Sequence, residues 1–511
     1  MVDEVKPRGN PCGGKISSRY ILAVLGSVGL GIVYGLKVNL HVAIVSMVNH
    51  TAVAATEGSD HESSVGESNC ASEVLSNSTA VPAEDGPFAW PGTVQGILLS
   101  AYFWGYLVAQ IPGGRVAELF SAKWVMFFSV AINIICTLLT PLMAQLHFGA
   151  LIAMRIGEGI GGGVSFPAMH VMLAHWAPPS ERSVMSSIVY AGTALGTVVF
   201  MLVSGIIAGA VGWAEVFYIE GGVSLIWLIL WTVLVADSPT SQRFISKEER
   251  DFIVSSLNQG QEGVKHEEKH KMPWKSVLTS PAFLAILVAH TCSNWGWYMV
   301  LIELPLYMKT ALNFKISENA VLTAVPFLCM WLFSLILSKT LDTLREKKFI
   351  STTTARKTAT GCASVIPMIC FIALCYVGCQ RALAVFLMTL AVMSIGGMFC
   401  GFLSNHIDIA PNFAGTLMAL TNTVATIPGI IVPVFVGKLT TADSSIRSWR
   451  IIFWTTVGFY IVEILVYMVF ASGEEQPWNK VEESAGESQP LTSTKQKKEE
   501  INVEKPEVKA I

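Results

Sequence analysis

Four ionisable side chains lie inside two long apolar runs of the sequence. Lys37 and His41 share a run from about residue 20 to residue 48, and Arg155 and Glu158 share one from about 148 to 174. An ionisable group inside a membrane span is costly to bury, so such groups are candidates for function by default. The members of each pair are four and three residues apart, which places them on one face of a helix. Each run therefore predicts a helix that presents a cationic side chain together with a second titratable group.

Lys37 and Arg155 are expected at the same depth. If the two runs cross the membrane in opposite directions, Lys37 lies about ten residues and Arg155 about seven residues from the same surface, which is about 10–15 Å at 1.5 Å per residue. Arginine offers a planar fork for a carboxylate or phosphate, and lysine offers a point charge. The pair predicts a binding site for an anion. The alternative is that each cation pairs with a carboxylate or extends toward the membrane surface.

Glu158 admits two interpretations that are compatible with one another. It could neutralise Arg155 in a structural ion pair, or it could bind a coupling cation, Na⁺ or H⁺, in one state and Arg155 in the other. His41 and His170 are further candidates for cation coupling, and the alternative for each is a bond to a backbone carbonyl. No resident cofactor is expected, because no pair of the ten cysteines has metal-ligand spacing and no nucleophile–base constellation is present.

The kind of molecule that carries these residues follows from its composition. Of 511 residues, 52% are hydrophobic and only 14% are charged, against about a quarter charged in a soluble domain, and the mean hydropathy is +0.53. The net charge of −3 implies no bulk attraction to nucleic acid. These figures exclude an ordinary cytosolic enzyme, a nucleic-acid-binding protein and a disordered scaffold, and they predict a membrane protein.

Apolar segments long enough to span a membrane, about 20 residues or more, divide the chain. They lie near 20–48, 92–117, 124–145, 148–174, 183–210, 214–236, 278–308, 317–338, 355–377, 381–402, 414–438 and 450–471. We therefore predict an all-α membrane protein with twelve transmembrane helices in two six-helix bundles. The predicted parts are an N-terminus (1–19), a first bundle (20–236) with an outer loop (49–91), a linker (237–276), a second bundle (277–472) and a disordered tail (473–511).

The distribution of basic residues predicts the orientation of the chain. Residues 49–90 contain no Lys or Arg, whereas 237–276 and 339–354 are rich in both, so the N-terminus, linker and tail are assigned to the cytosol. Asn49 and Asn77 each begin a glycosylation sequon in the outer loop. Cys70 and Cys379 are both assigned to the outer side, where they could form a disulfide, but the sequence alone does not fix the pairing.

Two short turns at equivalent positions of the two halves carry a carboxylate and a basic residue. Arg115 and Glu118 follow the second span, and Asp342 and Arg345 follow the eighth. Repeated halves are the expected construction of a carrier whose two bundles rock about a central site. We predict that these turns act as gates; the alternative is that any cytosolic turn tends to be charged.

Short motifs recur along nearly the whole chain. They are YGLKVNL (34–40), RIGEG (155–159), FPAMH (166–170), WAPPSERS (176–183), SNW (293–295), NHIDIAP (405–411), TNT (421–423), IPG (427–429) and QPWN (476–479). In these motifs the chain resembles the anion:cation symporter branch of the major facilitator superfamily, which includes sialin, the vesicular glutamate transporters and the type I sodium–phosphate cotransporters.

The resemblance implies secondary transport of an anion by alternating access, coupled to protons or sodium or driven by the membrane potential. It implies a role for Glu158 in coupling, and it implies substrate contacts from Lys37, Arg155, Asn294 and Asn422. Two positions depart from the family. Lys37 stands where the family usually has Arg, which removes a bidentate fork. Gly162 stands where sialin and the glutamate transporters have a second Glu, which argues against simple proton symport by the route of sialin.

The sequence thus favours sodium-dependent symport of an anion, with phosphate as the first candidate. The alternatives are proton-coupled transport of sialic acid or an acidic amino acid across a lysosomal or vesicular membrane, and a non-transporting sensor built on the carrier fold. The expected partners are a small anion, a coupling cation and the lipid bilayer, without nucleic acid, and the carrier is expected to act as a monomer. Residues 1–19 and the tail contain no acidic dileucine signal, which favours the plasma membrane.

Overall fold

Long apolar helices form most of the chain. The computed structural model describes residues 17–49, 52, 86–258, 272–310, 316–378, 380–442 and 446–479. The first half contains α1 (Ser18–Met47), α3 (Gly92–Leu119), α4 (Ala122–Leu146), α5 (Phe148–Gly163), α6 (Ser165–Trp176), α7 (Arg182–Ala210) and α8 (Trp213–Leu234). Helices α9 (Lys247–Asn258) and α10 (Trp274–Leu278) belong to the linker. The second half contains α11 (Pro281–Thr310), α12 (Ile316–Glu346), α13 (Thr352–Val377), α14 (Arg381–Ile395), η1 (Gly396–Phe399), α15 (Phe402–Ile409), η2 (Pro411–Phe413), α16 (Ala414–Ala425), α17 (Ile427–Ala442), α18 (Ile446–Phe470) and η3 (Pro477–Asn479).

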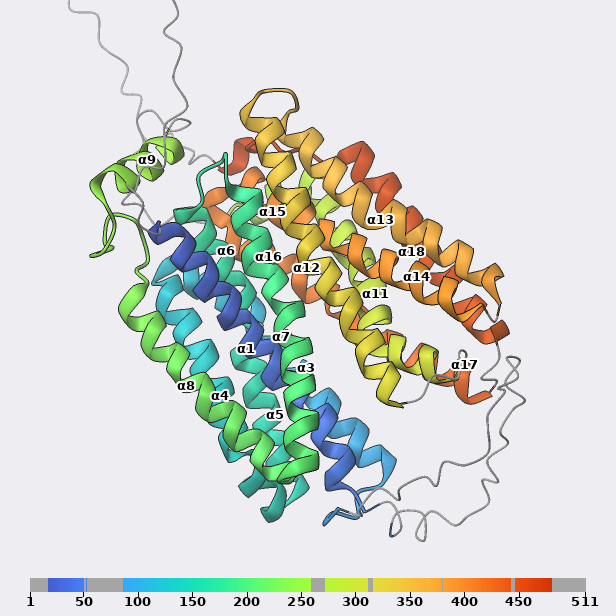
Figure 1. Ribbon diagram of the computed structural model, residues 1–511. Coiled ribbons are helices and arrows are strands. Elements are labelled where there is room, and N and C mark those ends of the chain that lie inside the picture. The colour runs from blue at the N-terminus through green and yellow to red at the C-terminus, as the bar shows by residue number, and fades with distance from the viewer. Residues whose placement is uncertain are drawn as a thin grey trace, which may run out of the picture.

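The helices agree with the predicted twelve-span architecture. Ten helical segments of the described chain are long and apolar enough to cross a membrane, judged by length and composition. Helix α11 and the consecutive helices α5 and α6 cover the other two predicted spans. Figure 1 shows the first half, coloured blue to green, lying beside the second half, coloured yellow to red. The chain is therefore an all-α membrane protein built from two bundles of helices.

Three of the predicted spans are interrupted rather than continuous. In the tenth, η1 separates α14 from α15. The other two breaks lie near a proline. Val164 separates α5 from α6, and Thr426 separates α16 from α17. Val164 lies three residues before Pro167, and Thr426 lies two residues before Pro428. A proline cannot donate a backbone hydrogen bond to the preceding turn of a helix. Pro112, in contrast, lies inside an unbroken α3. Proline therefore breaks the helix only in some spans.

Polar side chains start new helices in the short turns between spans. The Ser121 hydroxyl accepts from the Trp124 amide at 3.2 Å, and the Ser351 hydroxyl accepts from the Thr354 amide at 3.1 Å. His147 accepts from the Gly149 amide at 3.0 Å and separates α4 from α5. An N-cap of this kind satisfies a backbone donor that the helix itself leaves without a partner. The turn at His147 is the short break predicted between the third and fourth spans.

Helices α3 and α5 approach each other closely through glycine. A Cβ atom on Gly159 would lie 2.0 Å from the Tyr102 carbonyl oxygen, and one on Gly105 would lie 2.1 Å from the Ile156 carbonyl oxygen. Small residues let the backbones of neighbouring membrane helices meet in this way. The contact brings the ionisable residues of α5 against the aromatic side chains of α3.

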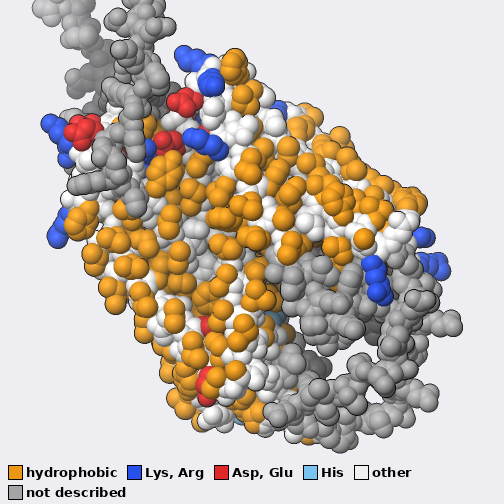
Figure 2. All heavy atoms as spheres, viewed as in Figure 1, with side chains coloured by type: hydrophobic (Ala, Val, Ile, Leu, Met, Phe, Trp, Pro, Cys, Tyr) orange, Lys and Arg blue, Asp and Glu red, His pale blue; other side chains and the backbone are white. Residues whose placement is uncertain are grey.

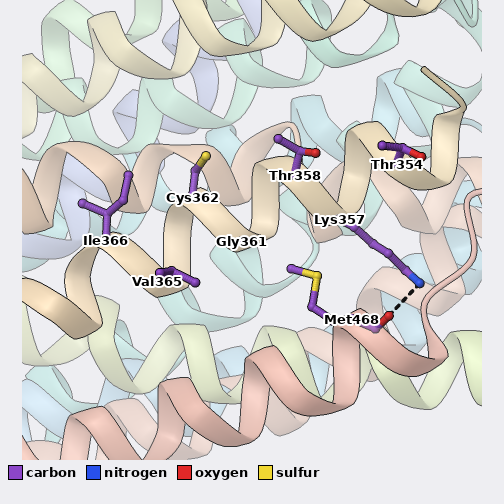
Figure 3. A pocket seen from close by; sticks show the side chains of 8 residues that line it. All are labelled: Thr354, Lys357, Thr358, Gly361, Cys362, Val365, Ile366 and Met468. Atoms are coloured by element: carbon purple, nitrogen blue, oxygen red, sulfur yellow. Dashed lines mark hydrogen bonds between the residues drawn. The ribbon is translucent and has the colours of Figure 1, made fainter. Parts of the chain in front are cut away.

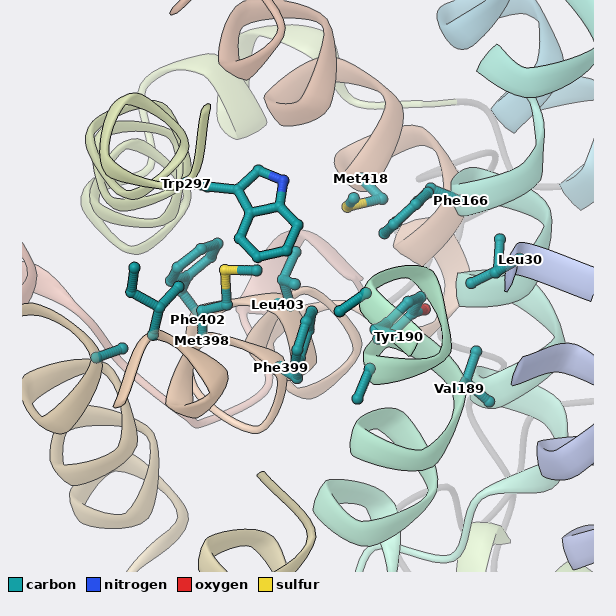
Figure 4. Close-up of a cluster of buried hydrophobic side chains, with 14 of the residues drawn as sticks. Leu30, Phe166, Val189, Tyr190, Trp297, Met398, Phe399, Phe402, Leu403 and Met418 are labelled. Carbon is teal, nitrogen blue, oxygen red and sulfur yellow. The ribbon is translucent and has the colours of Figure 1, made fainter. Parts of the chain in front are cut away.

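The two halves also share an apolar interface. Phe166 of α6 and Tyr190 of α7 stack with ring centroids 5.3 Å apart. Figure 4 shows these rings in one cluster with Trp297, Leu403 and Met418 of the second half. The apolar core of the protein therefore runs from one bundle into the other.

A buried ionic network joins the halves at the end of the molecule that carries residues 237–258, here called the linker end. Asp408 of α15 accepts from Arg182 of α7 at 2.8 Å and from Arg356 of α13 at 2.5 Å. Arg356 also donates to the Ser183 hydroxyl at 2.6 Å and to the Cys400 carbonyl at 2.7 Å. Charged side chains gather at this end of the surface, and apolar side chains cover most of the rest (Figure 2). The protein is therefore closed between the halves at its linker end.

Candidate functional site

Arg155 and Glu158 form an ion pair inside the first half. Arg155 Nη1 donates to Glu158 Oε2, and each side chain is only 1% exposed. Thr137 of α4 donates to the other carboxylate oxygen of Glu158 at 3.2 Å. Arg155 Nη2 donates to the backbone carbonyl of Lys37 at 2.8 Å, as the predicted common depth of the two residues requires. In this conformation Glu158 neutralises Arg155, and the pair connects α1, α4 and α5.

Lys37 lies in a cage of aromatic rings. Its Nζ atom is 4.3 Å from the centroid of Phe103 and within about 6 Å of four tyrosine rings, those of Tyr34, Tyr102, Tyr106 and Tyr298. Among the described residues, none of the carboxylates lies within ion-pair distance of this ammonium group. Ring faces attract a cation but bring no negative charge to neutralise it. Lys37 is therefore a cation whose charge none of the described carboxylates balances.

The two predicted asparagines lie on the second half and connect to this cage. Asn422 of α16 donates to the Tyr106 hydroxyl at 2.9 Å, so it bonds to a ring that contacts Lys37. Asn294 of α11 donates to the Ala425 carbonyl at 2.8 Å. The structure thus brings Lys37, Arg155 and Asn422 together across the two halves, and Asn294 supports the helix that carries Asn422.

The two predicted coupling histidines differ in their surroundings. His41 follows Lys37 by one turn of α1 and its side chain is exposed. His170 is fully buried, where it bonds to the Phe166 carbonyl at 3.1 Å, the Tyr190 hydroxyl at 2.6 Å and the Leu403 carbonyl at 3.1 Å. These contacts match the alternative given for His170, a bond to a backbone carbonyl. Its role in cation coupling stays a prediction.

Both predicted gate turns reach across to the opposite half. Glu118 accepts from the backbone amide of Thr416, the third residue of α16, at 2.6 Å, and also from its hydroxyl. Asp342 accepts from the backbone amide of Val184, the third residue of α7, at 2.9 Å. Arg115 and Arg345 each pair with the carboxylate of their own turn, at 2.9 and 3.2 Å. Each half therefore caps a helix of the other half at the linker end.

The features predicted for the outer side lie mostly outside the described residues. Asn77, Cys70 and Cys379 belong to this group, so their glycosylation and pairing stay predictions. The Asn49 side chain accepts from the Ala52 amide at 2.7 Å. Glycosylation of Asn49 likewise stays a prediction.

Sequence reasoning missed the aromatic part of the site. Tyr102 and Tyr106 are one helical turn apart in a long apolar run, and this spacing was the available signal for a polar face on α3. Tyr298 of α11 completes the cage, but no second tyrosine lies one helical turn away from it in the sequence. The buried Arg182–Asp408–Arg356 network was missed as well, because nothing local joins residues of three helices.

Tyr102 also explains the space around Gly162, where the sequence departs from related carriers. A Cβ atom on Gly162 would lie 1.9 Å from the Tyr102 hydroxyl oxygen, which is buried without a hydrogen-bond partner. The Tyr102 ring in turn lies 5.6 Å from the Arg155 guanidinium carbon. A tyrosine hydroxyl therefore occupies the volume into which a side chain at position 162 would extend.

We expect Gly162→Ala to lower the stability of the folded protein by roughly 1–3 kcal/mol, the usual effect of overpacking a core. Combining it with Tyr102→Phe, which removes the clashing oxygen, should cost less than the sum of the two single changes. Thermal unfolding of the purified variants in detergent measures this coupling. Gly222→Ala is the matched control, because a Cβ at Gly222 meets nothing within 4 Å. Strictly additive effects would contradict the clash.

A second hollow lies away from this site. A surface groove of about 440 Å³ runs between α13 and α18, and Figure 3 shows Thr354, Lys357 and Gly361 among its lining residues. The Lys357 ammonium donates to the Met468 carbonyl at 2.7 Å. None of the residues that line this groove is a predicted site residue.

Known proteins match this chain over most of its length. The family model described as Major Facilitator Superfamily matches residues 69–433. Sialin from Ovis aries is 40% identical over 474 residues, which cover 92% of this chain and 93% of that protein. A protein named "Putative inorganic phosphate cotransporter" from Drosophila melanogaster is 35% identical, covering 94% and 89% of the two chains. Vesicular glutamate transporter 3 from Danio rerio is 35% identical, covering 92% and 76%.

Solved structures show the same architecture. The proton:xylose symporter XylE aligns with a TM-score of 0.66 and 17% identity, covering 90% of this chain and 97% of that one. At this identity the likeness concerns the fold, which agrees with the twelve-helix arrangement of two bundles described above.

Proposed function

Because this chain belongs to the Major Facilitator Superfamily, and within it to the group of sialin, the vesicular glutamate transporters and the inorganic phosphate cotransporters, we propose that it moves an organic anion together with a cation. The members of this group are transporters and not enzymes, and this chain is a transporter of the same group. The substrate, the coupling ion and the residues that handle them are the parts that we propose here.

One observation carries the proposal: the site contains two cationic side chains but only one carboxylate. Glu158 is bound to Arg155, whereas Lys37 has no carboxylate within ion-pair distance among the described residues. An anion that binds Lys37 and then Arg155 competes with Glu158 for the guanidinium. Once displaced, Glu158 is an unpaired carboxylate in a membrane interior and takes up a proton or Na⁺. Anion binding and cation binding are thereby coupled at one residue.

The surroundings of Lys37 favour an organic acid over inorganic phosphate. Every oxygen of a phosphate needs a donor or a cation, but the Lys37 cage presents mainly aromatic faces. A carboxylate needs fewer donors, and the carbon skeleton behind it packs against rings. We therefore rank an acidic sugar or acidic amino acid first and reverse the order that the sequence favoured.

Phosphate transport is the second candidate. It is supported by the Drosophila relative, which is 35% identical over 94% of this chain. The coupling ion is Na⁺ in that case and H⁺ or Na⁺ in the first. The name of the vesicular glutamate transporter assigns that relative to vesicles, so an internal membrane stands beside the plasma membrane as the proposed location. The carrier is proposed to act as a monomer.

Uptake into proteoliposomes tests the proposal. We expect labelled sialic acid or glutamate to accumulate under an imposed proton or sodium gradient. Lys37→Met should weaken apparent affinity about 10- to 150-fold, because a charge-assisted contact contributes about 1.5–3 kcal/mol. Lys37→Arg retains the charge and should keep most of the uptake. The fold should tolerate both changes, since Lys37 leaves no carboxylate unpaired when it is replaced.

Other outcomes have distinct meanings. Sodium-driven uptake of phosphate without uptake of the two organic acids would establish the second candidate. Full transport by Lys37→Met would show that Lys37 does not bind the substrate. If folded protein transports none of the three anions under either gradient, the proposal is contradicted for these substrates. The alternative of a non-transporting sensor would then be favoured.

A further inference from the structure

Glu463 of α18 is a carboxyl group buried deep in the second half. Its side chain is 0% exposed, and among the described residues neither carboxylate oxygen has a partner within the usual distance and angle limits of a hydrogen bond. Helix α18 packs against α11 and α13, so the residue lies inside its own bundle rather than between the two halves. It is separate from the Arg155–Glu158 pair, which lies in the first half.

The groups around Glu463 supply oxygen atoms but no positive charge. Tyr460 lies one turn earlier on α18, and its fully buried hydroxyl likewise has no hydrogen-bond partner in the part of the chain that the structure describes. Ser364 of α13 and Cys292 of α11 lie beside the carboxyl group. The titratable groups that face Glu463 are therefore Cys292 and Tyr460, neither of which is a cation. Among the described residues, Glu463 takes part in none of the ion pairs.

An ionised carboxylate in this position would be very unstable. Moving an isolated charge from water into an apolar interior is far more costly than burying a neutral polar group, so the group becomes neutral or gains a counter-ion. A buried carboxyl group in a membrane span is paired or functional by the same argument. Because the described residues offer no cationic partner here, a small cation from solution would fill that role.

We propose that Glu463 is a second cation-binding carboxyl group of the carrier, which holds a proton or a sodium ion in the linker-end-closed conformation. A proton turns the group into a neutral acid with one O–H donor, for which the Tyr460 and Ser364 oxygens are acceptors. A sodium ion uses the same two hydroxyl oxygens and the carboxylate as oxygen ligands, as hard cations prefer. Both occupants provide the single positive charge that the pocket lacks.

The site on α18 lies beside α11, the helix that reaches the candidate substrate region. Cys292, beside Glu463, is two residues from Asn294, which bonds to α16 at 2.8 Å. Cation binding at Glu463 therefore acts on the packing of α11 between α18 and α16. This coupling to transport rests on the proposed function, whereas the binding of the cation does not.

The test compares wild-type protein with Glu463→Gln in lipid nanodiscs. Infrared spectra report whether the carboxyl group is protonated, and thermal unfolding in sodium chloride against choline chloride reports sodium binding. A protonated carboxyl band that is lost in Glu463→Gln identifies a proton. Stabilisation by sodium that rises to saturation, as binding to the folded state requires, and that is lost in Glu463→Gln identifies Na⁺. An ionised carboxylate band lost in the variant, with no effect of sodium, overturns the proposal.

Tyr460→Phe keeps the proposal testable if Glu463→Gln does not fold. It removes one oxygen ligand, so it should weaken a sodium ion's stabilising effect at least several-fold, and it should leave a protonated carboxyl band in place at a shifted frequency. The proposal is contradicted if both this variant and the wild type show an ionised carboxylate band and neither is stabilised by sodium. Because neither readout uses transport, cation binding without sialic acid or glutamate uptake would reject only the proposed function.

Discussion

Replacing Arg155 with alanine is expected to abolish anion transport and to lower the stability of the fold by about 3–5 kcal/mol. This size is expected when one member of a buried ion pair is removed, because the other charge is left without a partner. Here Glu158 would keep only the Thr137 hydroxyl, and the Lys37 carbonyl would lose its donor. Uptake in proteoliposomes and thermal unfolding of the same preparation measure the two effects separately.

A double variant separates the structural part of this effect from the functional part. Arg155→Ala/Glu158→Ala removes both charges, so it should recover much of the stability lost in Arg155→Ala alone. It should not recover transport, because the anion contact and the cation-coupling group are then both absent. Transport by the single variant at wild-type rate would show that Arg155 only balances Glu158.

Replacing Asp408 with alanine is expected to open the linker end. The change leaves Arg182 and Arg356 buried without their shared carboxylate, and both arginines lie between the two halves. We expect a loss of about 3–5 kcal/mol in stability for the same reason as above. We also expect faster modification of Cys400, which is 0% exposed and whose carbonyl binds Arg356. Mass spectrometry after maleimide treatment measures the labelling of each cysteine.

Arg250→Ala provides the matched control for Asp408→Ala. Arg250 and Asp251 form an ion pair at 3.5 Å in which the side chains are 41% and 59% exposed. Surface pairs of this kind contribute about 0–1 kcal/mol, so stability and Cys400 labelling should stay near wild type. If Asp408→Ala leaves Cys400 as protected as Arg250→Ala does, the network does not hold the halves together.

The parts of the site that the sequence predicted are those that depend on local spacing or depth. Arg155 and Glu158 are three residues apart on one helix, so their pairing follows from helical geometry. The nearness of Lys37 and Arg155 follows from counting residues from the membrane surface. The architecture followed from the lengths of the apolar runs, because only α-helices and closed β-barrels can cross a bilayer.

The parts that could not be predicted depend on how the two halves dock. The Glu118–Thr416 contact joins residues 298 positions apart, and the His170–Leu403 contact joins residues 233 positions apart. No periodicity within one helix specifies such a partner. A single fully buried carboxyl group such as Glu463 also looks the same in sequence whether a neighbouring helix supplies a cation or not.

The crossed caps of Glu118 and Asp342 have a consequence for the kinetics of the carrier. Each carboxylate binds the third amide of a helix in the opposite half, and losing one N-cap costs about 1 kcal/mol. A rigid rocking motion that parts the halves at this end breaks both caps in the same step. Under such a motion the two contacts would add to one barrier instead of two successive small ones, and half-open states would be rare. Such two-state behaviour limits the time during which ions could leak through a partly open path without the substrate.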